Sequence, residues 1–312
     1  MAHPRRFRFG VQLHAPLPGT TWADTARQVE DMGYSALFLP DHFSEQYGPI
    51  AAMAAAAAVT DRLIVGTLVF DNDYRHPVTL AKEMATIDVI SGGRVEVGIG
   101  AGWKTTDYAE SGIAMESPKL RVERMFEGVQ VLRGLFADGP FDFHGEHYDI
   151  TGLDGTPTPH TPGGPPLLIA GGAKRMLRFA GANADIVGVN PSVHSGEVDA
   201  DAARDGMADR MDQKFDWVRE GAGDRFDELE FNAWVPVVSV TDDPAGYAEL
   251  LAPMFGVDAS EVLDSPMTMV GTVAGIGEQL EARRERWGFS YYVVQNDAAL
   301  EVAPIVAAHA GG

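Results

Sequence analysis

Residues 95–103 have the sequence VEVGIGAGW, an apolar strand that runs directly into a cluster of glycines. A glycine-rich turn after a strand is typical of two α/β architectures, the open dinucleotide-binding sheet and the closed (β/α)8 barrel. The dinucleotide motif G-x-G-x-x-G beginning at Gly98 requires a glycine at position 103, where this chain has Trp103. No acidic residue clearly ends the next strand either, so the stretch favours the barrel.

The rest of the chain repeats the same alternation of apolar strands and helical patterns. Seven further strands are expected at residues 7–13, 35–40, 63–69, 166–170, 186–189, 229–240 and 291–295, with a small hairpin at 141–151. Helical patterns lie between them, as at 77–91, where Leu80, Met84 and Ile87 fall on one face. Eight strand–helix units predict an α/β fold, a (β/α)8 TIM barrel, that forms a single domain over residues 1–312.

The composition of the chain excludes several classes of function and partner. The chain has no cysteine, which excludes disulfides, thiolate metal sites and a cysteine nucleophile. Its net charge of −21 would repel nucleic acid and anionic membranes, so we expect neither as a partner. The longest apolar run, residues 51–59, is too short to span a bilayer, and no signal sequence is recognisable. We therefore expect a cytoplasmic enzyme that acts on a small molecule.

Polar residues that follow the strands mark the expected active site, because catalytic groups of such barrels lie where strands end. Asp41 and His42 follow the second strand. A histidine exchanges protons near neutral pH, and an adjacent carboxylate can bind a ligand hydroxyl. The alternative is a surface pair that caps the next loop. We take His42 as the candidate catalytic acid–base.

Gly171, Gly172 and Ala173 open a helix after the fifth strand. Backbone N–H groups at a helix start bind phosphate, and glycine lets an anion approach closely. Lys174 and Arg175 add positive charge beside this turn. The alternative is an ordinary tight turn between a strand and a helix.

Two further features allow a functional and a simpler interpretation. Trp103 has a flat ring that would form one wall of the binding site for a flat cofactor. The simpler interpretation is a side chain that packs at the rim of the barrel. His144 and His147 lie three residues apart on the hairpin, a spacing that is more often incidental than metal-binding. We expect no metal site.

Several short motifs occur in a characteristic order. They are Phe7–Val11, Leu39–Phe43, Gly66-Thr67 before Arg75–Pro77, Ser91–Arg94, Gly98–Trp103, Asp107-Tyr108 through Gly112-Ile113, Arg121–Arg124, Phe143–Tyr148 and Leu168–Gly172. Together they resemble the bacterial luciferase-like superfamily of flavin and deazaflavin oxidoreductases. The resemblance covers most of the chain.

The resemblance implies a barrel with an insertion before the fifth strand and a cofactor, F420 or FMN, across its C-terminal rim. It implies that Asp41 and His42 contact the ring or its hydroxylated chain, with His42 in proton transfer. It also implies a bulge behind the ring at Thr67-Leu68-Val69, with a non-proline cis peptide at Leu68-Val69, and a phosphate turn at Gly171-Gly172. The remaining residues assigned to the cofactor site are Gly100, Gly102, Trp103 and Ala173. Barrels of this kind often pair, so a homodimer is expected.

The ending Gly102-Trp103 is similar to a broad deazaflavin branch, so we expect an oxidoreductase that transfers hydride between coenzyme F420 and a small organic substrate. Sugar-phosphate dehydrogenases of that branch place a glutamate where this chain has Trp103, so we do not expect a sugar phosphate. Two alternatives remain open: an FMN-dependent monooxygenase that uses a separate reductase, and a binding protein without a cofactor.

Overall fold

The computed structural model describes residues 5–193 and 199–311 of the chain. Parallel strands form a ring in the order β1 (Arg8–Gln12), β2 (Ala36–Leu39), β3 (Ile64–Thr67), β5 (Val95–Gly100), β8 (Leu167–Gly171), β9 (Ile186–Val189), β10 (Glu230–Val235) and β13 (Phe289–Gln295). The ring closes because β13 pairs with β1 and β3 pairs with β5. The predicted (β/α)8 barrel is confirmed.

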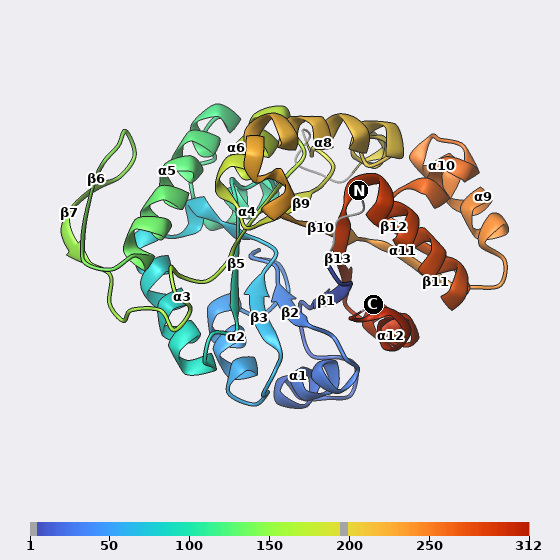
Figure 1. Ribbon diagram of the computed structural model, residues 1–312, viewed down its shortest axis with the longest axis horizontal. Helices are drawn as coiled ribbons and strands as arrows, with labels where there is room; N and C mark the ends of the chain where they lie inside the picture. The colour runs from blue at the N-terminus through green and yellow to red at the C-terminus, as the bar shows by residue number, and fades with distance from the viewer. Residues whose placement is uncertain (1–4, 194–198, 312) are drawn as a thin grey trace.

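Helices surround the barrel (Figure 1). They are α1 (Trp22–Asp31), α2 (Pro49–Ala57), α3 (Pro77–Ser91), α5 (Pro118–Phe136), α6 (Lys174–Asn183), α8 (Ala208–Ala222), α11 (Val273–Trp287) and α12 (Ala298–His309). Their ends follow local signals in the sequence. Thr21 accepts a hydrogen bond from the backbone N–H of Asp24 at the start of α1, and Gly92 ends α3 in the left-handed conformation.

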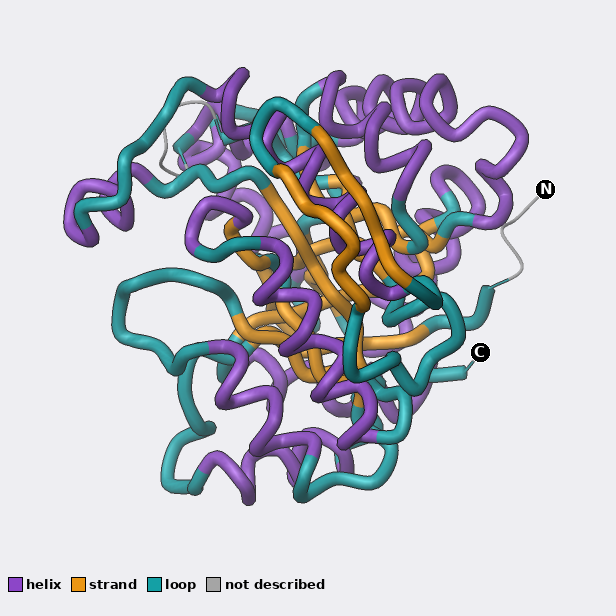
Figure 2. Tube along the Cα trace, turned by 90° about the vertical axis from the view of Figure 1, so that its left-hand side faces the viewer, coloured by secondary structure: helices purple, strands orange, loops and turns teal. Residues whose placement is uncertain are grey.

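An antiparallel hairpin of β6 (Pro140–His144) and β7 (Asp149–Asp154) lies outside α5 (Figures 1 and 2). It precedes β8, the fifth strand of the barrel ring, so the predicted insertion and hairpin are confirmed. Smaller elements complete the described chain: β4 (Phe70–Asp71), α4 (Thr105–Ser111), α7 (Ala200–Asp205), α9 (Pro244–Phe255), α10 (Ala259–Asp264) and 3-10 turns at Asn72–Tyr74 and Gly223–Glu228.

The prediction of one strand over residues 229–240 is wrong. The segment divides at Pro236 into β10 and β11 (Val237–Val240), and β11 leaves the barrel to pair with β12 (Thr268–Gly271). Proline has no N–H to donate to a ladder, so it breaks the strand at this point. The helix expected at 204–220 also divides, into α7 and α8, near Gly206.

Charged residues close the N-terminal end of the barrel. Arg8 forms ion pairs of 2.6 Å with both Glu96 and Glu230, and the Tyr291 hydroxyl lies 3.0 Å from Glu96. Burial raises the pKa of Glu96. A cavity of about 310 Å³ adjoins these residues at this end. The loops that follow the strands lie at the opposite, C-terminal end of the barrel.

Within the described residues, no helix combines the length and apolar character that crossing a bilayer requires.

Candidate active site

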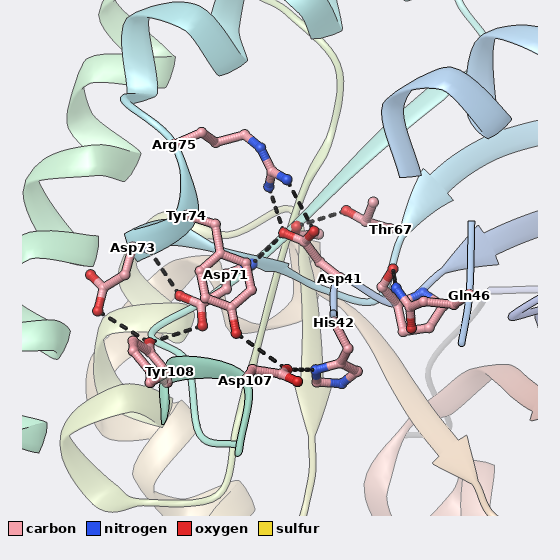
Figure 3. Close-up of polar contacts among 12 residues, drawn as sticks. Asp41, His42, Gln46, Thr67, Asp71, Asp73, Tyr74, Arg75, Asp107 and Tyr108 are labelled. Carbon is pink, nitrogen blue, oxygen red and sulfur yellow. Dashed lines mark hydrogen bonds and ion pairs between the residues drawn. The ribbon is translucent and has the colours of Figure 1, made fainter. Parts of the chain in front are cut away.

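The C-terminal ends of β2, β3 and β5 lie side by side, because β3 pairs with both of its neighbours. Asp41 and His42 follow β2, the bulge follows β3, and Trp103 follows β5. Figure 3 shows the polar side chains that gather there. The structure thus brings these predicted residues to one part of the rim. Gly171 ends β8, the next strand of the ring, and Gly172 and Ala173 follow it.

The bulge after β3 has the predicted form. The Leu68-Val69 peptide bond is cis, and pairing with β5 resumes at β4. The Gln12 side-chain amide donates a hydrogen bond to the Leu68 carbonyl, and its oxygen accepts from Gln295 at 2.8 Å and from Trp234 at 3.3 Å. Side chains from three strands therefore fix the backbone at the bulge.

Glycines of β5 make room for this bulge. A Cβ atom on Gly98 would lie 1.9 Å from the carbonyl oxygen of Thr67, and one on Gly100 would lie 2.8 Å from Cγ2 of Val69. Gly102 has a φ of +75°, and a Cβ there would lie 2.0 Å from the Tyr108 hydroxyl. Close packing thus requires glycine at these positions, and cofactor contact by Gly100 and Gly102 stays a prediction.

Asp41 is buried in an ion pair. Its carboxylate accepts hydrogen bonds from the Arg75 guanidinium at 2.5 and 3.0 Å and from the backbone N–H of Asp71 at 3.0 Å. These contacts hold the residues after β2 against residues 71–75, which follow the bulge. The carboxylate therefore also has a structural task beside any contact with a cofactor.

His42 has a carboxylate partner that sequence analysis missed. Its Nδ1 lies 2.6 Å from Oδ2 of Asp107, which lies in the first turn of α4 (Figure 3). The Tyr74 hydroxyl donates to the same oxygen at 3.3 Å, and Lys104 Nζ lies 3.5 Å from Oδ1. The Trp103 ring meets the imidazole edge-on, with centroids 5.6 Å apart. The only sequence signal for Asp107 was its place in a family motif.

A second acidic group lies beside this pair. The Tyr108 hydroxyl lies 2.9 Å from Oδ2 of Asp71 and 3.1 Å from Oδ2 of Asp73, and Asp73 also pairs with Arg124 at 2.9 Å. Burial raises the pKa of Asp71 to about 6, against the opposing effect of its hydrogen bonds from Asp73 and Tyr108. Burial, followed by the electrostatic effect of the nearby His42 and Lys104, lowers the pKa of His14, which follows β1.

The turn after β8 leads into α6, and its binding of an anion stays a prediction. Ala173 caps α6 without a side-chain hydrogen bond, so the first N–H groups of the helix lack a side-chain partner. A Cβ atom on Gly172 would lie 2.4 Å from the backbone nitrogen of Ser192. The buried Lys214 amine donates to the carbonyl of Gly172 at 3.1 Å and holds the turn in place.

The two cations expected to assist this turn are paired elsewhere. Lys174 forms an ion pair with Glu220 at 3.2 Å, and Arg175 forms one with Glu123 at 3.0 Å. Their charge is therefore largely neutralised by partners on neighbouring helices, which weakens the case for them as phosphate ligands.

Arg121 supplies a cation that sequence analysis did not single out. It is 6% exposed, and its Nε and Nη1 atoms are buried without a hydrogen-bond partner. It lies at the N-terminal end of α5, beside α6, and these helices are joined by stacking of Phe126 on Phe179 at 3.7 Å. An unpaired buried guanidinium is costly, so its natural complement is an anionic ligand.

Comparison with known proteins identifies the family. The luciferase-like monooxygenase family matches residues 6–216. The chain belongs to this family. It is 33% identical over 172 residues to an F420-dependent glucose-6-phosphate dehydrogenase of Nocardia farcinica (strain IFM 10152), an alignment that covers 52% of this chain and only half of that enzyme.

Solved structures of both cofactor types share the fold. The coenzyme F420-dependent tetrahydromethanopterin reductase of Methanopyrus kandleri superposes with a TM-score of 0.73 at 20% identity, covering 98% of this chain and 99% of that one. The oxygenating constituent of 3,6-diketocamphane monooxygenase of Pseudomonas putida, in complex with FMN, superposes with a TM-score of 0.66 at 18% identity, covering 97% of this chain and 96% of that one.

Residues 5–193 and 199–311 hold no cluster of three His, Asp or Glu side chains suited to a metal.

Proposed function

We propose that this luciferase-like protein transfers hydride between coenzyme F420 and a small organic substrate, with His42 exchanging the proton that accompanies the hydride. The observation that carries the proposal is the contact of His42 with Asp107 at the C-terminal rim. An imidazole held against a buried carboxylate is a common arrangement for a general acid–base.

The residues of the rim fit a cofactor with a flat ring and a phosphate. Arg121 offers two nitrogens without partners, and the turn at Gly171, Gly172 and Ala173 offers backbone N–H groups. We assign the phosphate to these two elements and the ring to the surface formed by the bulge and Trp103. When bound, F420 would supply the site that accepts or releases a hydride.

The chain itself has three tasks in this reaction. The fixed backbone of Leu68 and Val69 would hold the cofactor ring at one depth in the barrel mouth. Trp103 and Trp234 would exclude water from the reacting atoms. His42 would take a proton from the substrate when the substrate is oxidised and return it in the reverse reaction.

F420 is preferred to FMN because the curated relative with 33% identity is F420-dependent. A sugar phosphate is not the proposed substrate. Of the cations near His42, Lys104 lies 3.5 Å from Asp107 and Arg75 is paired with Asp41, so both already have carboxylate partners. The FMN-dependent monooxygenase is the second candidate, since the same phosphate anchor and the same fold suit FMN.

Fluorescence titration of the purified protein with each cofactor tests the proposal. We expect F420 to bind at least about tenfold more tightly than FMN, a difference of about 1.4 kcal/mol. Tighter binding of FMN would contradict the F420 proposal and favour the FMN-dependent monooxygenase. Binding of neither cofactor would support a binding protein without a cofactor.

A further inference from the structure

The two nitrogens of His42 have different surroundings. Nδ1 lies 2.6 Å from Oδ2 of Asp107, and the Asp107 side chain is only 3% exposed. The His42 side chain retains 22% exposure, so one part of the ring stays open. The imidazole is therefore anchored by one nitrogen and accessible elsewhere.

The contacts of Asp107 show that its carboxylate acts as an acceptor. Oδ2 accepts from the Tyr74 hydroxyl as well as from the imidazole (Figure 3). Lys104 Nζ lies 3.5 Å from Oδ1. An ionised carboxylate has no proton to donate. The proton between Asp107 and His42 must then belong to Nδ1, and in the neutral imidazole Nε2 carries a lone pair.

The residues that hold the His42 imidazole in place come from regular elements or pack directly against the ring. Asp107 lies in the first turn of α4, and Tyr74 comes from the 3-10 turn of residues 72–74. Trp103 packs edge-on against the ring, at an interplanar angle of 89°. The Asp107 carboxylate and the Trp103 ring both contact the imidazole, and they oppose a rotation that would move Nδ1 away from Asp107.

We propose that Asp107 is the positioning residue of this site: it holds His42 in the Nδ1–H tautomer, so that Nε2 exchanges the proton with the substrate. The catalytic part of this inference rests on the proposed function. During oxidation, the bond between the proton and a substrate oxygen or nitrogen breaks and an N–H bond forms at Nε2. The neighbouring carbon loses its hydride to F420, a double bond forms in the substrate, and the imidazole becomes positively charged.

The tautomer is measurable without cofactor or substrate. Two-bond ¹H–¹⁵N correlation spectra of the ¹⁵N-labelled protein at about pH 9, where imidazole is neutral, distinguish the two tautomers. His42 is one of nine histidines, and the variant His42→Gln assigns its signals. We expect the Nδ1–H pattern for the unmodified protein. An Nε2–H pattern for the signals assigned to His42 would overturn the proposal.

Asp107→Asn tests the cause. The amide can turn its NH₂ group toward Nδ1, which selects the opposite tautomer. We expect the His42 signals to change to the Nε2–H pattern, whereas Asp107→Glu, which keeps the charge, should restore the Nδ1–H pattern. Asp88→Asn is the matched control, because Asp88 is equally buried and accepts its hydrogen bonds from Thr161, away from the rim. An Nδ1–H pattern in Asp107→Asn would contradict the proposal.

Kinetics with F420 give the second readout. We expect Asp107→Asn to lower kcat by about 100-fold or more, with KM and F420 affinity changed by less than about threefold, because the tautomer matters in the transition state. A loss confined to KM would also contradict the proposal. If F420 does not bind at all, the proposed function fails, but the spectra of the cofactor-free protein still decide the role of Asp107.

Discussion

The Arg121 guanidinium lies 5.5 Å from the centre of the Tyr108 ring, with two nitrogens buried and without hydrogen-bond partners. The ring gives this cation one favourable contact, but a contact of this kind compensates for only part of the lost hydration. An anion supplied by a ligand would complete its environment. The same residue therefore links the stability of the free protein to its affinity for a cofactor.

Replacing Arg121 with methionine should separate the effect of this cation on the stability of the free protein from its effect on cofactor affinity. We expect the affinity for F420 to fall by about 10-fold to 100-fold, since hydrogen bonds to charged groups contribute about 1.5–3 kcal/mol. The unliganded variant should melt at the same temperature or a higher one, because an uncompensated buried charge is removed.

The matched control is Arg133→Met, at the other end of the same helix, where Arg133 pairs with Asp185 at 2.7 Å. This variant should keep full affinity for F420. If Arg121→Met also kept its affinity, Arg121 would not be part of the phosphate anchor.

His42→Ala should lower turnover far more than it lowers cofactor affinity. General acid–base catalysis contributes about 100-fold to 10,000-fold, so we expect a loss of kcat in that range. Stopped-flow absorbance of F420 measures the rate, and fluorescence titration measures affinity. Turnover at the normal rate would remove His42 from the mechanism.

Asp71 should make stability depend on pH. Its pKa is raised from 3.8 to about 6 in the folded protein, so the folded state holds this proton more tightly than the unfolded state. Stability should therefore fall as pH rises from about 4 to about 6, by up to about 3 kcal/mol from this group, and then remain at the lower value. Asp71→Asn should lose this part of the dependence in urea unfolding at a series of pH values, and an unchanged profile would contradict the assignment.

The bulge after β3 should make Gly98 intolerant of any side chain. Alanine there would place a Cβ atom 1.9 Å from the carbonyl of Thr67, so the backbone must move. We expect a loss of about 3 kcal/mol or more in urea unfolding. Gly48→Ala is the control, because a Cβ at Gly48 has no neighbour within 4 Å and its φ of −62° suits alanine. Equal stability of the two variants would mean that the bulge is not tightly packed.

Much of the fold could be predicted from local signals. Apolar strands, helix caps such as Thr21 and the glycines that end α3 are readable in the sequence, because each depends on residues close in the chain. Pro236 marks the break between β10 and β11, although the apolar pattern of residues 229–240 continues on both sides of it. The short strand β12 offers too few residues for a clear pattern, and the polar helix α4 has no apolar stripe to reveal it.

The candidate site was predictable only in part. Strand ends placed His42 and Asp41 at the rim, since the barrel geometry fixes where strands end. Their partners come from far along the chain: Asp107 lies 65 residues after His42, and Arg75 lies 34 residues after Asp41. Such pairings are set by tertiary packing, which no local pattern records. The unpaired state of Arg121 is likewise visible only in the folded chain.

A crystal structure of the protein with F420 tests the central claim most directly. The barrel offers two rival locations, the C-terminal rim at His42 and the cavity of about 310 Å³ beside Arg8 and Glu230 at the other end. We predict cofactor density at the rim, with the ring against the bulge of Leu68 and Val69 and the phosphate on Arg121. Density in the cavity beside Arg8, with the rim empty, would contradict the account.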